Sequence, residues 1–322
     1  MSARTRIVAI VAALAAAAVA VVVGAAALQS STATDAEPAG ERPEGAPPLL
    51  LDLGVRDDAS ARELRRAAGL YEQGELRPAA EAFASARGLE ADVGLALASW
   101  PHETVPALQR LAARHPGSAF VRLELGLARF WSGQEEPAKQ AWREARRVEP
   151  DSLSAVRAGD LLHPNSPRGL PVFVPSEPTP NLDGLTPEQQ LDRLRSDAVR
   201  GGGAEKLVYG VALQRLGRPL SARRQYDAAV VSQPGSVEAK VAAAVARFDK
   251  ADPSRAFARL GPLARSHPKD PSVRFHLGLL LLWLGDVEDA RRQLRLAEAA
   301  APHPLAREAN RFLERLASVG TS

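Results

Sequence analysis

The sequence predicts an all-α solenoid of about seven antiparallel helix pairs followed by a capping helix, and three observations lead to this fold class. Pro234, Pro268 and Pro302 are spaced 34 residues apart. Small residues recur with the same period, at the places where paired helices must cross closely. Hydrophobic residues make up 45% of the chain but aromatic residues only 5%, which suits helices packed at short range. Because one helix pair cannot bury both of its faces, the units must stack.

Each unit has the same arrangement of small and large residues. It carries a small residue in its first helix, another at the turn, a small–large–small triplet in its second helix, and a closing proline. The copy over residues 119–152 shows the full set: Gly126, Gly133, Ala138, Trp142, Ala145 and Pro150. This pattern resembles the tetratricopeptide (TPR) repeat. The resemblance covers most of residues 60–304 and implies a protein-binding scaffold without enzymatic activity.

The N-terminal stretch over residues 7–28 is uncharged and is predicted to be a transmembrane signal-anchor. At about 1.5 Å per residue it is about 33 Å long, which is enough to cross the hydrocarbon core. Arg4 and Arg6 precede it, so residues 1–6 are expected in the cytoplasm and the rest of the chain outside. A cleaved secretory signal is the alternative, and it exports the same residues. Abundant Ala, and Arg in excess over Lys, indicate a GC-rich bacterial genome, so the exported chain is expected in a bacterial cell envelope.

Composition excludes several classes of function. The absence of cysteine rules out disulfides, thiolate metal sites, a cysteine nucleophile and an acylated lipoprotein. The histidines are scattered and show no metal-ligand spacing, so neither a metal nor another cofactor is expected. Removing Arg4 and Arg6 from the formal charge of +3 leaves 3 − 2 = +1, which argues against a nucleic-acid partner.

The remaining elements follow in order along the chain. Residues 29–58 are rich in Pro, Gly, Ser and acidic residues and are expected to form a flexible linker. TPR-like repeats are expected over residues 59–162 and 187–304, and a capping helix with one apolar face over residues 305–318. The proline-rich residues 163–186 form a loop between the two sets of repeats.

This loop interrupts the fourth unit, whose helices are expected at residues 153–162 and 187–200. The second of these opens with Thr186 as N-cap, followed by Pro187 and by Gln189 for a capping box. Within the loop, the run Leu-Pro-Val-Phe-Val-Pro (residues 170–175) is apolar and extended. We expect it to be buried, either on the groove of its own array or on a partner.

The TPR resemblance also implies which residues line the concave groove. It assigns the following residues to partner binding: Phe130, Trp131, Leu207, Arg215, Phe248, Phe275, Leu279, Leu282 and Trp283. Most are apolar, so a clamp for a C-terminal carboxylate is not supported, and the groove is expected to accept an amphipathic helix or an extended hydrophobic segment. The alternative is that these side chains simply pack against neighbouring helices of the array.

The functional hypothesis is a membrane-tethered extracytoplasmic scaffold that binds a protein or peptide partner through an apolar concave groove. The layout of anchor and repeats looks like that of the TPR component of c-type cytochrome maturation, which holds apocytochrome, and this is a narrower alternative. A purely structural envelope spacer is a further alternative. An enzyme is disfavoured, because no stretch outside the repeats is long enough for a catalytic domain.

Overall fold

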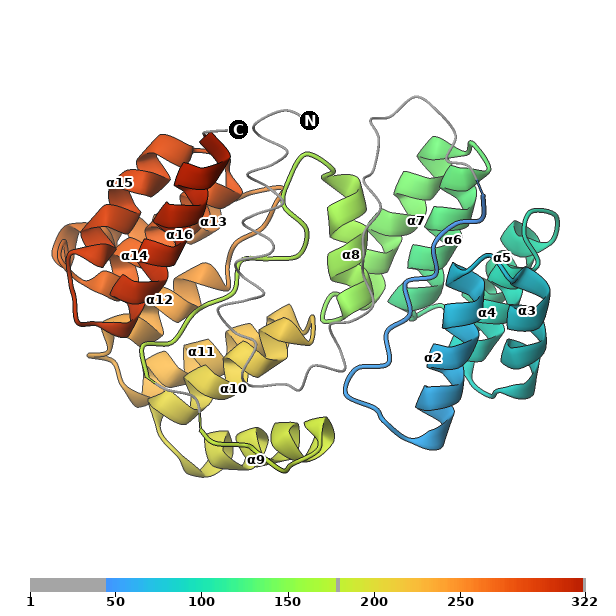
Figure 1. Cartoon of the computed structure of the whole chain (residues 1–322), viewed down its shortest axis with the longest axis horizontal. Coiled ribbons are helices and arrows are strands. Elements are labelled where there is room, and N and C mark those ends of the chain that lie inside the picture. Colours follow the sequence, from blue (N-terminus) through green and yellow to red (C-terminus); the bar gives the residue numbers. More distant parts are fainter. Residues whose placement is uncertain (1–44, 178–179, 321–322) are drawn as a thin grey trace. The chain divides into compact units, whose positions relative to one another are not determined.

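The computed structural model describes residues 45–177 and 180–320 of the 322-residue chain (Figure 1). All regular secondary structure in these two ranges is α-helical, which confirms the predicted all-α class. The predicted cytoplasmic end and membrane anchor, residues 1–28, lie outside the described residues, as does the first part of the predicted linker over residues 29–58. Among the helices that are described, none combines the length and the apolar character needed to span a membrane.

The chain divides into two compact units, which we call the N-unit (residues 45–162) and the C-unit (residues 163–320). The helices of the N-unit are α2 (Ala59–Glu72), α3 (Leu76–Ser85), α4 (Leu89–Ala98), α5 (Thr104–Arg114), α6 (Ala119–Trp131), α7 (Glu135–Val148) and α8 (Leu153–Leu162). The helices of the C-unit are α9 (Pro187–Arg200), α10 (Gly203–Arg215), α11 (Pro219–Ser232), α12 (Val237–Val245), α13 (Ser254–Ser266), α14 (Pro271–Trp283), α15 (Val287–Glu298) and α16 (Pro304–Gly320).

Consecutive helices pack as pairs, and at the crossings of α6 with α7 and of α10 with α11 a glycine lies against a large side chain. A Cβ atom at Gly126 of α6 would lie 2.2 Å from Nε1 of Trp142 on α7. A Cβ atom at Gly210 of α10 would lie 2.4 Å from the ring of Tyr226 on α11. At both positions a larger residue would force the paired helices apart. The small-against-large crossings therefore confirm the predicted phase of the repeats.

Several of the turns inside the pairs depend on glycine. Gly133, Gly217 and Gly285 adopt φ angles of 76°, 67° and 78°, in the left-handed region that other residues rarely occupy. Each lies between the two helices of its pair, where the chain must reverse direction within a few residues. The small residue that the repeat places at the turn is thus required there by the backbone conformation.

The sixth unit departs from this pattern at its turn. Its first helix, α12, ends at Val245, so Phe248 lies in the connection to α13 rather than on the helix, where the sequence places it. Arg247 donates a hydrogen bond from Nη1 to the carbonyl oxygen of Ala243, and pairs through Nη2 with Asp227 at 2.8 Å. A side chain that satisfies a carbonyl group of the last turn favours ending the helix there.

The two helices expected to form a fourth pair are divided between the units. Helix α8 packs on α6 and α7 and closes the N-unit, whereas α9 packs on α10 and opens the C-unit. The interpretation of residues 153–200 as one interrupted pair is therefore corrected. The start of α9 is as predicted, because Thr186 and Gln189 form the expected capping box.

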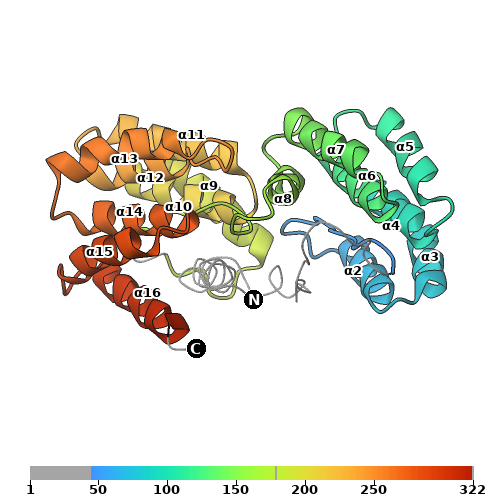
Figure 2. The same cartoon turned by 90° about the horizontal axis from the view of Figure 1, so that it is seen from above.

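The chain closes with α16, which packs on α14 and α15 (Figure 2). Leu305, Ala309, Phe312 and Leu316 are buried in this contact, as the apolar face of the expected capping helix predicts. The first helix of each C-unit pair also contacts the first helix of the next, α10 with α12 and α12 with α14. We call the surface formed by α10, α12 and α14 the inner face of the C-unit.

Candidate functional site

An extended segment of the chain lies on the inner face of the C-unit. This segment, which we call the C-strap (residues 167–176), precedes α9, and Figure 1 shows the chain running along the C-unit before that helix begins. Gln214 of α10 contacts its main chain on both sides. The amide Oε1 accepts a hydrogen bond from the N–H of Phe173 at 3.1 Å, and Nε2 donates to the carbonyl oxygen of Pro171 at 3.3 Å. Tyr226 donates to the same Oε1 at 2.7 Å and thereby fixes the orientation of the amide group.

His276 of α14 provides the second contact with the C-strap. Its Nε2 accepts a hydrogen bond from the N–H of Val174 at 3.0 Å, and its Nδ1 lies 2.7 Å from the carbonyl oxygen of Ser272. Because a carbonyl group can only accept, the proton is on Nδ1 and the ring is neutral. Complete burial lowers the pKa of His276 to about 4, since water cannot solvate the charged ring. The ring also stacks on Phe173, with 4.9 Å between centroids.

Two further polar side chains hold the ends of the C-strap. Glu238 of α12 accepts a hydrogen bond from the N–H of Ser176, and the Lys250 ammonium group donates to the carbonyl oxygen of Pro167. The Phe173 side chain between them is fully buried. The C-strap is thus bound as a peptide would be, with its main chain paired by polar side chains from several helices and its aromatic side chain in an apolar pocket.

The N-unit holds a second extended segment in a similar way, which we call the N-strap (residues 46–53). The N–H of Leu50 donates to Oε1 of Glu124 on α6 at 2.9 Å. Nη1 of Arg157 on α8 donates to the carbonyl oxygens of Leu50 and Leu51 at 2.6 Å and 3.2 Å. Main-chain donors and acceptors of the N-strap are therefore paired by side chains from two helices.

A third contact to the N-strap comes from α2, where the hydroxyl group of Tyr71 donates to the carbonyl oxygen of Pro47 at 2.6 Å. Burial raises the pKa of Tyr71, and the neighbouring carboxyl group of Glu124 adds to this effect. Leu49 is buried in the apolar cluster that contains Tyr71 and Leu64. Apolar side chains and main-chain hydrogen bonds together hold this segment, as they do in the C-unit.

The electrostatics of the N-strap contact are unusual, because Glu124 is completely buried. Burial raises its pKa to about 8, partly offset by the hydrogen bond from Leu50 and by the charge of Arg157. Among the described residues, its Oε2 has no hydrogen-bond partner. Burial also lowers the pKa of Arg157. At neutral pH the carboxyl group is therefore mainly protonated, while Arg157 keeps its charge.

Most partner-binding residues predicted for the C-unit lie in its own core. Six of them are at most 8% exposed: Leu207, Phe248, Phe275, Leu279, Leu282 and Trp283. They belong to one apolar cluster that also contains Phe173 and Val174 of the C-strap. The open apolar groove expected from the sequence is therefore closed in the C-unit by the chain itself. The physical reason is that the apolar loop segment lowers its free energy by burying its side chains there.

Arg215 differs from these residues because it is a cation and only half-buried. Its Nε atom has no hydrogen-bond partner among the described residues. Burial lowers the pKa of the guanidinium group to about 10. At neutral pH this group stays charged, and its Nε–H is a donor for an anionic or carbonyl oxygen.

Phe130 and Trp131, the predicted binding residues of the N-unit, are half-buried at the end of α6. Their rings lie edge to face with centroids 5.8 Å apart, and Phe130 also contacts the ring of Trp142 at 5.9 Å. Leu50 of the N-strap packs against the same cluster. The indole N–H of Trp131 has no hydrogen-bond partner within the described part of the chain.

The sequence alone did not identify the polar residues that contact the two straps. These residues are Gln214, Glu238, Lys250 and His276 in the C-unit and Tyr71, Glu124 and Arg157 in the N-unit. One signal was present for two of them: Glu124 and His276 are single ionisable residues within otherwise apolar stretches of their helices. A buried ionisable group requires a partner, and here the partner is the main chain of a strap.

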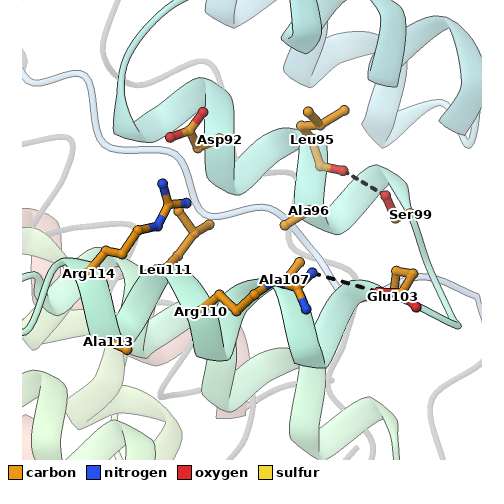
Figure 3. Close-up of a pocket in the computed structure, with 10 residues that line it drawn as sticks. All are labelled: Asp92, Leu95, Ala96, Ser99, Glu103, Ala107, Arg110, Leu111, Ala113 and Arg114. Atoms are coloured by element: carbon orange, nitrogen blue, oxygen red, sulfur yellow. Dashed lines mark hydrogen bonds and ion pairs between the residues drawn. The ribbon is translucent and has the colours of Figure 1, made fainter.

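A separate hollow of about 830 Å³ lies between α4 and α5 (Figure 3). Its walls are mostly apolar, and Arg110 pairs with Glu103 at its edge at 3.7 Å. Over residues 45–177 and 180–320, no group of three or more His, Asp or Glu side chains is arranged to hold a metal ion.

Several solved structures are similar to this chain at low sequence identity. No family model and no curated protein match the chain. It is similar to yeast Tom70 at 11% identity, with a TM-score of 0.32 over 81% of this chain and 54% of that one, so it spans about half the length of Tom70. The thermophilic TPR protein TTC0263 of Thermus thermophilus shares 16% identity, with a TM-score of 0.26 over 82% of this chain and 100% of that one.

The TPR domain of P58(IPK) shares 14% identity, with a TM-score of 0.28 over 82% of this chain and 79% of that domain. Because all three TM-scores are low, the assignment of the fold rests on the helix pairs of this chain. With their 34-residue period, their glycine turns and their small-against-large crossings, these pairs have the TPR architecture.

Proposed function

We propose that the protein is a membrane-tethered, extracytoplasmic scaffold whose TPR units bind extended segments of a protein partner. One observation carries the proposal: each unit holds an extended chain segment through hydrogen bonds to its main chain. Contacts of this kind give affinity for any extended peptide, whereas pockets for single side chains give specificity. Both straps are parts of the same chain, and the way they are held supports an extended segment as the ligand.

The tether is proposed from residues 7–28, which are long and apolar enough to span a bilayer, with Arg4 and Arg6 before them. Protease added to intact spheroplasts should digest the chain beyond residue 29. The matched control is lysed spheroplasts, in which a cytoplasmic marker protein is digested as well. Survival of the repeats until lysis would show that the proposed orientation is wrong.

Partner binding can be tested by photo-crosslinking in intact membranes. Phe130 is a half-buried aromatic residue beside the N-strap, and an aromatic photo-crosslinker in its place preserves much of its shape. The matched control places the same group at Arg143, which is exposed on α7. We expect adducts with another protein from position 130 and none of the same size from position 143. Equal labelling from both positions, or adducts within the chain alone, would contradict the proposal.

A further inference from the structure

The inner face of the C-unit holds the C-strap mainly through main-chain groups of the strap. Gln214, Glu238 and His276 pair with main-chain groups of the C-strap, so they do not depend on the identity of its side chains. They come from α10, α12 and α14, the first helices of successive pairs. A peptide in trans that presents N–H groups at the same spacing can make the same hydrogen bonds.

The side-chain specificity of this surface is concentrated at Phe173. Its ring is fully buried, stacks on His276 and meets Tyr226 edge to face at 5.7 Å. The neighbouring Val174 is 9% exposed, and prolines lie at positions 171 and 175. The site therefore accepts an extended, proline-flanked apolar peptide with one aromatic residue.

The C-strap leaves some polar groups on the same helices unpaired. Arg215 Nε on α10, and Ser272 Oγ and Trp283 Nε1 on α14, are buried and have no hydrogen-bond partner among the described residues. Unpaired buried polar groups weaken a complex. A peptide in trans must compete with the C-strap, which has the advantage of being tethered to its site.

The C-strap can leave the surface without unfolding a helix. It lies between α8 and α9, and no helix occurs in the described residues from 163 to 186. Its release would expose Phe173 and open the apolar pocket. An exchange between the tethered segment and an external one is therefore compatible with the architecture of the repeats.

We propose that the inner face of α10, α12 and α14 is the binding site for an extended, proline-flanked apolar peptide of another protein, and that the C-strap occupies it as an exchangeable self-ligand. This inference rests on the proposed scaffold function and specifies its ligand. It implies that the unbound protein is closed, and that weakening the C-strap increases affinity for the peptide.

The test uses the full chain in detergent and a fluorescent peptide of residues 167–177, with binding measured by anisotropy. Phe173→Ala in the protein should raise affinity for the peptide at least about thirtyfold over the wild type, because truncating an aromatic anchor typically has an effect of this size. A peptide with alanine in place of Phe173 should bind neither protein. The matched control is Phe257→Ala, which removes a ring that packs on the same core from α13.

Equal gains for Phe173→Ala and Phe257→Ala would show that the peptide binds a generally loosened protein, and would overturn the inference. No gain for Phe173→Ala would also overturn it. If that variant fails to fold, Val174→Pro serves instead, because it removes the N–H that His276 accepts and alters no repeat residue. Peptide binding that coincides with dissociation of a dimer would assign the site to a second copy of the chain and would contradict a separate partner.

The result of the peptide-binding assay can be distinguished from the result of the crosslinking experiment at position 130. The peptide assay needs no cellular partner and reports on the C-unit, whereas position 130 reports on the N-unit. Failure of the peptide to bind, together with specific adducts from position 130, would leave the scaffold function in place and remove the self-ligand. Binding of the peptide, together with no specific adducts from position 130, would leave a peptide site without the proposed scaffold function.

Discussion

Gly126→Ala is the smallest change that tests how the helix pairs are packed. The new Cβ atom would lie 2.2 Å from Nε1 and 2.4 Å from Cδ1 of Trp142. The Trp142 ring is 3% exposed, and its indole N–H donates to the carbonyl oxygen of Leu123 at 3.3 Å. The ring cannot move aside without losing this hydrogen bond or entering occupied space. The paired helices α6 and α7 must therefore separate.

The expected magnitude is the difference between two opposing effects. Overpacking a well-packed core typically costs about 1–3 kcal/mol, and loss of the indole hydrogen bond adds about 1 kcal/mol. Replacing glycine by alanine inside a helix contributes about 0.5–1 kcal/mol in the opposite direction. We therefore expect Gly126→Ala to destabilise the N-unit by about 1–3 kcal/mol. Gly126→Leu should cost at least as much.

Gly159→Ala on α8 is a matched control in the same unit. The nearest atom to its new Cβ is Nε of Arg146 at 3.7 Å, an ordinary van der Waals distance. Only the helix-propensity effect applies there, so this variant should be more stable than the wild type by about 0.5–1 kcal/mol. The two substitutions are chemically identical and are expected to have opposite effects.

The assay is urea unfolding followed by circular dichroism, extended to a double-mutant cycle with Trp142→Leu. The smaller side chain should relieve the clash, so the combined cost should be below the sum of the single costs by about 0.5–3 kcal/mol. Additive effects, or a Gly126→Ala variant as stable as Gly159→Ala, would refute the packing described for α6 and α7.

Three further predictions concern the straps and the core. The pKa of His276 is lowered to about 4 from 6.5, so its contribution to stability is complete above pH 6.5 and is lost as pH falls toward 4. The pKa difference is 6.5 − 4 = 2.5, so the loss of stability is on the order of 3 kcal/mol. Urea unfolding at a series of pH values should show this loss in the wild type and not in His276→Gln. Glu124 acts in the opposite sense: its pKa is raised to about 8 from 4.5, so the free energy of unfolding should fall as pH rises from 4.5 to 8. If Glu124→Gln shows the same dependence of stability on pH as the wild type, Glu124 is not its origin. Trp283→Ala should lower stability by about 3–5 kcal/mol, because this ring is 4% exposed and meets Phe248 edge to face; a wild-type melting temperature would show that the ring is not part of the core.

The sequence by itself determined most of the helices and their pairing, except for the expected fourth pair, whose helices α8 and α9 belong to different units. Hydrogen bonds in an α-helix join residues only four positions apart, so caps, turn glycines and apolar periodicity contain most of the necessary information. Thr186 and Gln189 thus indicated the start of α9, and the Gly126–Trp142 spacing indicated a crossing of two helices. The small and large residues of each repeat are close enough in the chain for a single period to relate them.

Only the tertiary structure decided which surfaces of the repeats are open. The N–H of Phe173 pairs with Gln214 across 41 positions, and that of Val174 pairs with His276 across 102. No local pattern specifies contacts at such separations, because a main-chain group can pair with any correctly placed side chain. The sequence therefore predicted that the apolar segment around Phe173 would be buried, but left open whether it would lie on its own array or on a partner. That placement depends on the summed burial and hydrogen bonding of residues brought together only by the complete fold.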